Sequence, residues 1–203
     1  MTHDAAWYDR VMVEEGSPAM LPLDESPWLP MYTEVAQLIR PEEEVVDLGC
    51  GTGRFIKLLL ERDHYAKITG IDWSAVALDE AHRYCASGPF HHEFEELEWL
   101  EGNLDHWTPA GDRAGNTVYV CTEVLEHMPM TTDVELVQRI PPGHRFLFSV
   151  PNYDSESHVR TFPHLSVIWG RYDQLLDFTR WALIGEPRKA VHICEARRRA
   201  DSW

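Results

Sequence analysis

The residues best suited to chemistry form a short run in which glycines alternate with other residues. The run is Asp47-Leu48-Gly49-Cys50-Gly51-Thr52-Gly53, between a short apolar segment and a segment with helical spacing. Glycines tolerate positive φ and allow the backbone to approach a ligand closely. The first amides of the following helix favour a negative group, such as the carboxylate of a methionine moiety. The run therefore predicts a ligand-binding turn from a strand into a helix.

Two acidic residues indicate which ligand this turn binds. Asp72 ends the next predicted strand, nineteen residues after Gly53, where an acid can accept hydrogen bonds from both hydroxyls of a ribose. The glycines have GxGxG rather than GxGxxG spacing, and Asp47 stands two residues before Gly49. A carboxylate there would face the pyrophosphate of a dinucleotide unfavourably, but it suits the ammonium of S-adenosylmethionine. We therefore expect S-adenosylmethionine as the cofactor.

A second polar group follows the predicted strand Thr117–Thr122. Glu123, Glu126 and His127 are predicted to lie on a helix over residues 123–128, where positions i, i+3 and i+4 share one face. Such a face can hold a divalent metal, or His127 can act as general base for an acceptor. It is equally open that Glu123 only hydrogen-bonds neighbouring loops and that His127 is a half-buried structural residue.

The segment after the predicted strand 145–150 supplies further candidates. Asn152 is a candidate substrate contact, and His158 and Arg160 are candidate contacts to an acidic or phenolic acceptor. His158 is also a second candidate base and the fourth possible metal ligand beside Glu123, Glu126 and His127. Alternatively, Arg160 pairs with an acid and His158 caps the loop.

Hydrophobic periodicity predicts alternating strands and helices, which is typical of βαβ units and a parallel sheet. The predicted strands cover residues 44–48, 67–71, 95–100, 117–122, 145–150, 179–184 and 189–196. The predicted helices cover residues 32–40, 54–62, 75–86, 123–128, 133–140 and 163–177. We expect an α/β fold: a doubly wound, mostly parallel seven-stranded sheet with helices on both faces and a terminal antiparallel hairpin.

The domain organisation expected from 203 residues is a single domain over 1–203. Residues 1–40, rich in proline and aromatic residues, would form an N-terminal lid or helical segment. Tyr8 within them is a candidate substrate contact. Residues 151–178 would form a cap on the acceptor side.

Composition narrows the class of partner. The net charge of −16 repels nucleic acid phosphates, which favours a small-molecule acceptor. The four cysteines are far apart and form no CxxC pair, which argues against a zinc or disulfide framework and fits a reducing cytoplasm. No apolar run is long enough for a membrane helix, and the first residues do not resemble a secretory signal, so we expect a cytoplasmic protein.

Residues 32–152 resemble the class I methyltransferase superfamily, and most closely its ubiquinone-type O-methyltransferases. The segments that carry the resemblance are Asp47–Gly53, Ile71–Ser74, Glu101–Leu104 and Cys121–Met128. It implies that Gly49, Gly51 and Gly53 line the methionine end, that Asp72 binds the ribose, that Trp73 flanks the adenine, and that Asn103 binds the adenine amine beside Leu104. Cys50, Thr52, Cys121 and Thr122 complete the expected cofactor-binding set.

We therefore expect an enzyme that transfers the methyl group in-line to an oxygen or nitrogen of a small molecule and releases S-adenosylhomocysteine. One alternative arises because the Glu-x-x-Glu-His pattern also resembles metal-dependent RNA ribose 2′-O-methyltransferases. Two others are a non-catalytic S-adenosylmethionine-binding protein and an NAD-dependent oxidoreductase.

Overall fold

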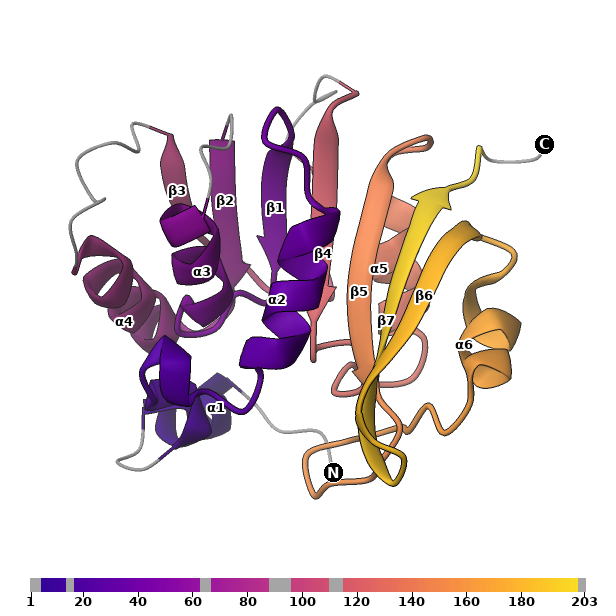
Figure 1. Ribbon diagram of the computed structural model, residues 1–203. Helices are drawn as coiled ribbons and strands as arrows, with labels where there is room; N and C mark the ends of the chain where they lie inside the picture. Colours follow the sequence, from indigo (N-terminus) through magenta and orange to yellow (C-terminus); the bar gives the residue numbers. More distant parts are fainter. Residues whose placement is uncertain (1–4, 14–16, 63–66, 88–95, 110–114, 201–203) are drawn as a thin grey trace. The chain divides into compact units, whose positions relative to one another are not determined.

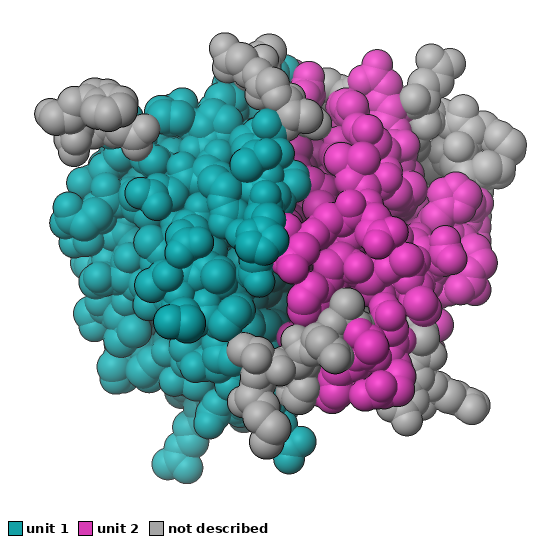
Figure 2. All heavy atoms as spheres, turned by 180° about the vertical axis from the view of Figure 1, so that it is seen from behind, with its two compact units in different colours: residues 1–2, 105–203 teal, residues 3–104 magenta. Residues whose placement is uncertain are grey.

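The computed structural model describes residues 5–13, 17–62, 67–87, 96–109 and 115–200 (Figure 1). The chain divides into two compact units, an N-terminal unit over His3–Leu104 and a C-terminal unit over Asp105–Trp203 with the first two residues (Figure 2). Within the described ranges, no helix has the length and apolar character needed to cross a membrane. The single domain expected over residues 1–203 stays a prediction.

The N-terminal unit contains three parallel strands in the order β3-β2-β1. Its elements are α1 (Ala5–Val13), η1 (Pro18–Met20), η2 (Leu23–Glu25), α2 (Leu29–Leu38), β1 (Glu44–Leu48), α3 (Arg54–Arg62), β2 (Lys67–Asp72), α4 (Ala75–Ala86) and β3 (Leu97–Glu101). β1 and β2 are almost wholly buried, although they carry polar residues such as Asp47 and Thr69. Helices α1 and α3 both contact α4.

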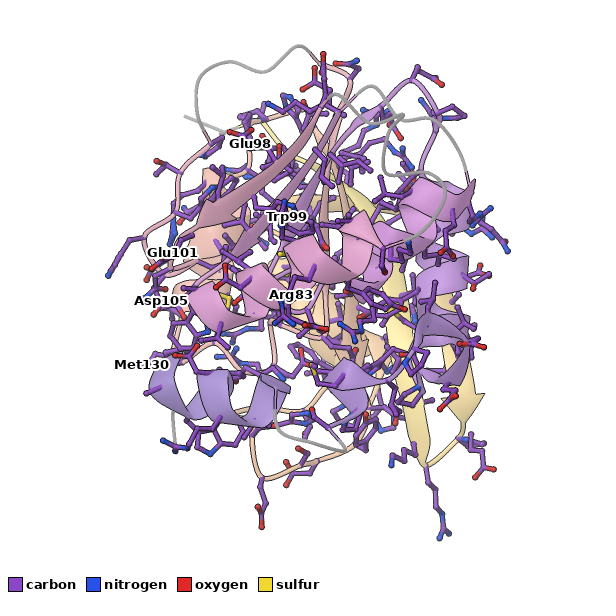
Figure 3. The ribbon with its side chains drawn as sticks, turned by 90° about the vertical axis from the view of Figure 1, so that its left-hand side faces the viewer. Arg83, Glu98, Trp99, Glu101, Asp105 and Met130 are labelled. Atoms are coloured by element: carbon purple, nitrogen blue, oxygen red, sulfur yellow. The ribbon has the colours of Figure 1, made fainter. Side chains whose placement is uncertain are left out.

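Gly70 on β2 shows how closely this unit packs. A Cβ atom there would lie 2.7 Å from the Trp99 ring of β3 and 2.8 Å from Ile56 of α3. Trp99 is labelled on β3 in Figure 3. Because glycine has no side chain, the Trp99 ring and α3 can both approach β2 at Gly70. Ile71 and Asp72 follow directly in the same strand.

The C-terminal unit contains four strands in the order β4-β5-β7-β6. Its elements are β4 (Thr117–Thr122), α5 (Thr132–Arg139), β5 (Arg145–Pro151), α6 (Leu165–Tyr172), β6 (Leu176–Glu186) and β7 (Lys189–Arg198). β4 pairs with β5 in parallel, whereas β7 is antiparallel to both β5 and β6. Stacked rings of Phe146 and Phe148 and the edge-on ring of Tyr172 form much of its core.

Most sequence-predicted elements are confirmed, several to the residue. Strands 44–48 and 117–122 and helices 54–62 and 75–86 begin and end as expected, and Ser74 caps the last of these by accepting a hydrogen bond from Ala77 N. The mostly parallel arrangement and the terminal antiparallel hairpin are also confirmed. The helix expected over residues 32–40 is observed as α2, which begins at Leu29, and residues 5–13 form the further helix α1.

Two predicted helices are wrong. Residues 123–128 form a turn instead of a helix, since Glu123 has a φ of 56° and the chain does not become helical again before Thr132. The helix expected over residues 163–177 is limited to Leu165–Tyr172, because Leu176 is buried and already pairs with Arg198 of β7. Pairing between strands overrides the helical spacing there.

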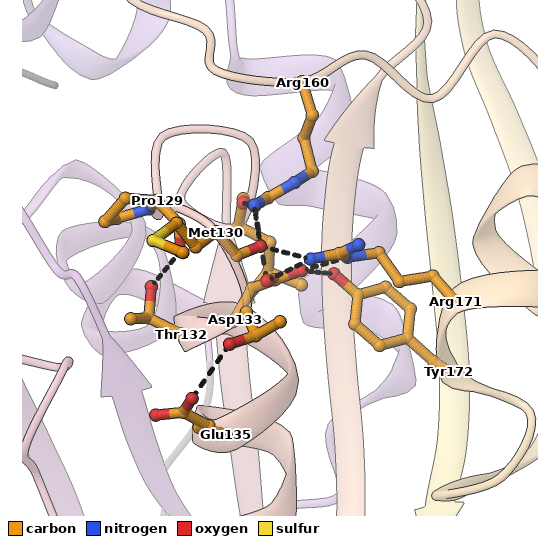
Figure 4. Close-up of polar contacts among 10 residues, drawn as sticks. Pro129, Met130, Thr132, Asp133, Glu135, Arg160, Arg171 and Tyr172 are labelled. Atoms are coloured by element: carbon orange, nitrogen blue, oxygen red, sulfur yellow. Dashed lines mark hydrogen bonds and ion pairs between the residues drawn. The ribbon is translucent and has the colours of Figure 1, made fainter. Parts of the chain in front are cut away.

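A buried carboxylate joins three segments of the C-terminal unit. Asp133 of α5 accepts hydrogen bonds from Arg171 Nε (2.5 Å) and Nη2 (2.6 Å) and from the Tyr172 hydroxyl (2.6 Å), as Figure 4 shows. Arg160 Nη1 lies 3.4 Å from the same carboxylate. Arg160 and Arg171 also each donate a hydrogen bond of 2.8 Å to the carbonyl oxygen of Met130. The network therefore ties α6 and the segment after β5 to the start of α5.

We expect Asp133→Asn to lower the free energy of unfolding by about 3 kcal/mol, because it leaves two guanidinium groups without their buried counter-charge. Urea unfolding followed by circular dichroism measures the change. Glu135→Gln is the matched control, since Glu135 is exposed on the same helix and bonds only to Thr131 in this network. It should change stability by less than about 0.5 kcal/mol. Equal stability of Asp133→Asn and the native chain would contradict this account of the network.

Candidate active site

The glycine turn between β1 and α3 has the backbone conformation that its sequence predicts. Gly49, Gly51 and Gly53 have φ angles of 81°, 52° and 78°, which side chains other than glycine rarely adopt. A Cβ atom on Gly53 would also lie 2.8 Å from the Cβ of Ala81 on α4. Glycine is therefore required there both by conformation and by the close approach of α4.

The turn is attached to the end of β2. The amides of Gly49 and Cys50 both donate to the carbonyl oxygen of Ile71, at 2.8 and 3.0 Å. The amide of Gly51 donates to Asp72 Oδ2 at 2.8 Å, and the amide of Ser74 donates to Asp72 Oδ1 at 3.0 Å. Asp72 thus holds the glycine turn and the start of α4 at once. Each of its oxygens retains a lone pair for a further donor.

Asp47 is a buried carboxylate near the end of β1, just before the glycine turn. It is 1% exposed, and within the described part of the chain neither of its oxygens accepts a hydrogen bond. Burial, assisted by the charge of Asp72, raises the pKa of Asp47 to about 8. A buried acid without a partner is costly, which suits a position that meets a positively charged ligand.

The remaining cofactor candidates of the N-terminal unit lie on the loops that follow its strands. Trp73 follows β2, and its ring lies 5.3 Å, centre to centre, from that of Tyr8 on α1. Tyr8, predicted to contact the substrate, is therefore placed beside the residue predicted to flank adenine. Asn103 and Leu104 follow β3, and the hydroxyl of Thr52 donates to Ala19 of η1 at 2.6 Å.

In the C-terminal unit, Cys121 and Thr122 end β4 and the turn over residues 123–128 follows. The helical face expected for Glu123, Glu126 and His127 does not exist, because these residues lie in a turn. Glu123 is held by Ser149 of β5: its amide donates to the Ser149 hydroxyl at 2.9 Å, and that hydroxyl donates to Glu123 Oε1 at 2.9 Å. The role of Ser149 was missed, because residue spacing carries no signal of this contact between strands.

The segment after β5 contacts that turn. The amide of Val159 donates to the carbonyl oxygen of Glu126 at 2.9 Å, and Arg160 Nη1 donates to that of Leu125 at 2.6 Å. The segment thereby brings His158 to His127, with ring centres 5.1 Å apart. Glu126, His127 and His158 form a cluster in which one potential ligand atom from each lies within 4.8 Å of the others.

Burial dominates the electrostatics of this cluster. It raises the pKa of Glu123 to about 7. Burial and the nearby charge of Glu123 raise the pKa of Glu126 well above its usual value. Burial lowers the pKa of His158. Burial disfavours the charged form of each group, and its effect exceeds the favourable charges of Arg160 near Glu126 and of Asp154 near His158.

The other acceptor-side candidates have structural contacts. Asn152 uses both ends of its amide on the β6–β7 hairpin, donating to the carbonyl oxygen of Pro187 at 2.9 Å and accepting from the amide of Ala190 at 2.8 Å. Arg160 is engaged with the carbonyls of Leu125 and Met130 and with Asp133. The expectation that Arg160 pairs with an acid is met by a residue of α5.

Comparison with known proteins supplies the family. Residues 45–141 match the model of a family described as a methyltransferase domain. The trans-aconitate 2-methyltransferase of Streptomyces avermitilis is 32% identical over 164 residues, which cover 76% of this chain and 56% of that protein. The corresponding protein of Azoarcus sp. strain BH72 is 33% identical over 117 residues, covering 56% and 42%. This chain thus spans about half the length of the curated relatives it matches.

The fold has counterparts among solved structures. N-methyltransferase NodS from Bradyrhizobium japonicum WM9, in complex with S-adenosylhomocysteine, matches with a TM-score of 0.72 at 16% identity, covering 96% of this chain and 97% of that one. At 16% identity, this match shows similarity of the fold alone. Together with the glycine turn and its two acids, these matches show that the chain belongs to the class I, Rossmann-like S-adenosylmethionine-dependent methyltransferases.

Proposed function

We propose that this protein binds S-adenosylmethionine and transfers its methyl group to an oxygen or nitrogen of a small-molecule acceptor, with S-adenosylhomocysteine as product. One observation carries the proposal. The turn with its three positive-φ glycines is held on the end of β2 by Ile71 and Asp72, and it follows Asp47, a buried carboxylate that accepts no hydrogen bond from the described residues. This arrangement offers backbone amides, a ribose acceptor and a site for a cation on consecutive loops of one unit.

Each part of the cofactor has a proposed partner in the N-terminal unit. The amides of the glycine turn would face the methionine carboxylate, and Asp47 would face its ammonium. Asp72 would accept hydrogen bonds from the ribose hydroxyls through its remaining lone pairs. Trp73, supported by Tyr8, would flank the adenine, with Asn103 and Leu104 beside it. Cys50 and Thr52 would contribute as residues of the turn.

The reaction would be an in-line displacement at the sulfonium methyl group. The sulfonium is already activated, so the protein mainly supplies proximity and orientation. An acceptor that must lose a proton during the reaction needs a general base to accept that proton. The cluster of Glu126, His127 and His158 is our candidate for that role, with His127 or His158 as base in the simplest case.

The acceptor named for the relatives, trans-aconitate, is not carried over to this chain. A tricarboxylate would need cationic partners. The cluster instead contains the buried acid Glu126 and lies beside a second acid, Glu123, and the terminal nitrogens of Arg160 already serve backbone carbonyls. These charges favour a neutral or cationic acceptor. The net charge of −16 likewise disfavours RNA, and the carboxylate of Asp47 disfavours the pyrophosphate of NAD.

Calorimetric titration with S-adenosylhomocysteine tests the cofactor site. We expect one site per chain, and we expect Asp72→Asn to weaken binding by about 10- to 100-fold, because the ribose loses charge-assisted hydrogen bonds. Asp79→Asn, an exposed position on α4, is the matched control and should bind as the native chain does. Circular dichroism checks that both variants fold. Tight NAD binding with no S-adenosylhomocysteine binding would refute the proposal.

The affinity for S-adenosylhomocysteine should depend on pH through Asp47. Below its pKa of about 8 the free protein holds a proton on this carboxyl, and the ligand's ammonium favours the ionised form. Binding must therefore release that proton, so the association constant should rise about tenfold per pH unit up to pH 8 and then level off. The charges of Cys50, Asp72 and Cys85 interact with that of Asp47, and Asp47→Asn should abolish the dependence. Identical pH profiles for Asp47→Asn and the native chain would show that Asp47 is not involved.

A metabolite-library screen with labelled S-adenosylmethionine identifies the acceptor. We expect turnover on a neutral or cationic small molecule, and loss of at least about 100-fold in kcat for His127→Ala or His158→Ala. S-adenosylhomocysteine binding should persist in both variants, since neither residue is assigned to the cofactor. Full turnover in both would exclude the cluster from the chemistry. Binding of the cofactor without turnover on any acceptor would indicate a non-catalytic protein.

A further inference from the structure

We propose that Glu126, His127 and His158 bind one divalent transition-metal cation, with Zn²⁺ as its representative. The proposal concerns metal binding by the C-terminal unit and does not depend on the methyl transfer proposed above. It also differs from the ligand set suggested by residue spacing, because Glu123 is engaged by Ser149 through both its amide and its carboxylate. Three ligands are therefore assigned instead of four.

The three side chains converge. Each offers a ligand atom within 4.8 Å of those of the other two, and His127 Nε2 lies 3.7 Å from Glu126 Oε1. Zn²⁺ has ligands at about 2.0–2.2 Å, which in a tetrahedron are about 3.3 Å apart. The separation of Glu126 and His127 therefore needs only a small side-chain rotation to reach that geometry.

Both imidazole rings are oriented as metal ligands usually are. His127 Nδ1 is 2.9 Å from the carbonyl oxygen of Ser157, and His158 Nδ1 is 3.2 Å from that of Tyr153. A carbonyl oxygen can only accept, so Nδ1 carries the hydrogen in each ring and Nε2 carries the lone pair. A backbone carbonyl that holds the other ring nitrogen is the typical support of a metal-bound histidine.

Glu126 supplies the independent reason for a cation. Its side chain is fully buried, and neither carboxylate oxygen has a hydrogen-bond donor in the described part of the chain. The carboxyl group of Glu123 is a second acid close enough to influence it. Buried acids are normally hydrogen-bonded, paired with a cation or bound to a metal. The charge of Arg160 favours the ionised form of Glu126, but its guanidinium is committed to two carbonyls and Asp133, so a bound cation would supply a direct partner.

The backbone holds the cluster in place. The hydrogen bond from Val159 N to Glu126 O lies between the two segments that carry the ligands, and Arg160 adds contacts to Leu125 and Met130. Binding therefore requires little ordering of loops. Two imidazoles and one carboxylate suit Zn²⁺ and its neighbours in the first transition row, and three protein ligands leave a coordination position open.

Metal binding is measured directly, without cofactor or acceptor. EDTA-treated protein is titrated with Zn²⁺ by calorimetry and with Co²⁺ by visible absorption. We expect one ion per chain and the bands of a four- or five-coordinate Co²⁺ site. Glu126→Gln and His158→Gln should each weaken Zn²⁺ binding by at least about 100-fold. His106→Gln, at an exposed position of the same unit, is the control and should bind as the native chain does.

Three results would overturn the proposal: no saturable Zn²⁺ binding, equal affinity in the native chain and His158→Gln, or a Co²⁺–thiolate band that reveals cysteine ligands. If Glu126→Gln fails to fold, as judged by circular dichroism, His158→Gln alone decides, because His158 lies half-buried on a loop. The S-adenosylhomocysteine titration described above is independent of these ligands. Failure of the metal site and failure of the cofactor site are therefore distinguishable.

Discussion

The carboxylate of Asp72 is the contact on which the candidate cofactor site depends. By accepting the amides of Gly51 and Ser74, it fixes the glycine turn after β1 relative to the first turn of α4. Gly53 can then pack against Ala81 without a side chain between them. An ionised acid accepts such bonds strongly, and the same carboxylate still has lone pairs for a ligand. Positioning of the turn and the proposed binding of the ribose therefore rest on one side chain.

Asp133 has the corresponding role in the C-terminal unit. It holds Arg171, Tyr172 and Arg160, and Arg160 in turn reaches the turn that contains Glu126. Here the buried acid is fully satisfied by its partners. Glu126 is buried to the same extent but lacks hydrogen-bond donors within the described residues, and this contrast distinguishes a structural acid from one suited to a ligand.

Where local rules govern the backbone, sequence reasoning was accurate. Helix α4 was predicted to the residue because Ser74 is a good N-cap and the helix needs little else. The strands over residues 117–122 and 145–150 were found because burial leaves largely apolar runs there. The turn after β4 was mispredicted as a helix because apolar spacing cannot reveal the positive φ of Glu123 or its contact with Ser149.

By itself, the sequence determined the glycine turn, the acids at positions 47 and 72 and hence the class of cofactor, because these residues act through local backbone conformation and charge. Only the tertiary structure decided which acceptor-side residues meet. It separated Glu123 from the expected ligand set, brought His158 to Glu126 and His127 across thirty residues, and assigned Asn152 and Arg160 to backbone contacts. Such contacts depend on how segments distant in the chain pack together, and residue spacing carries no record of that packing.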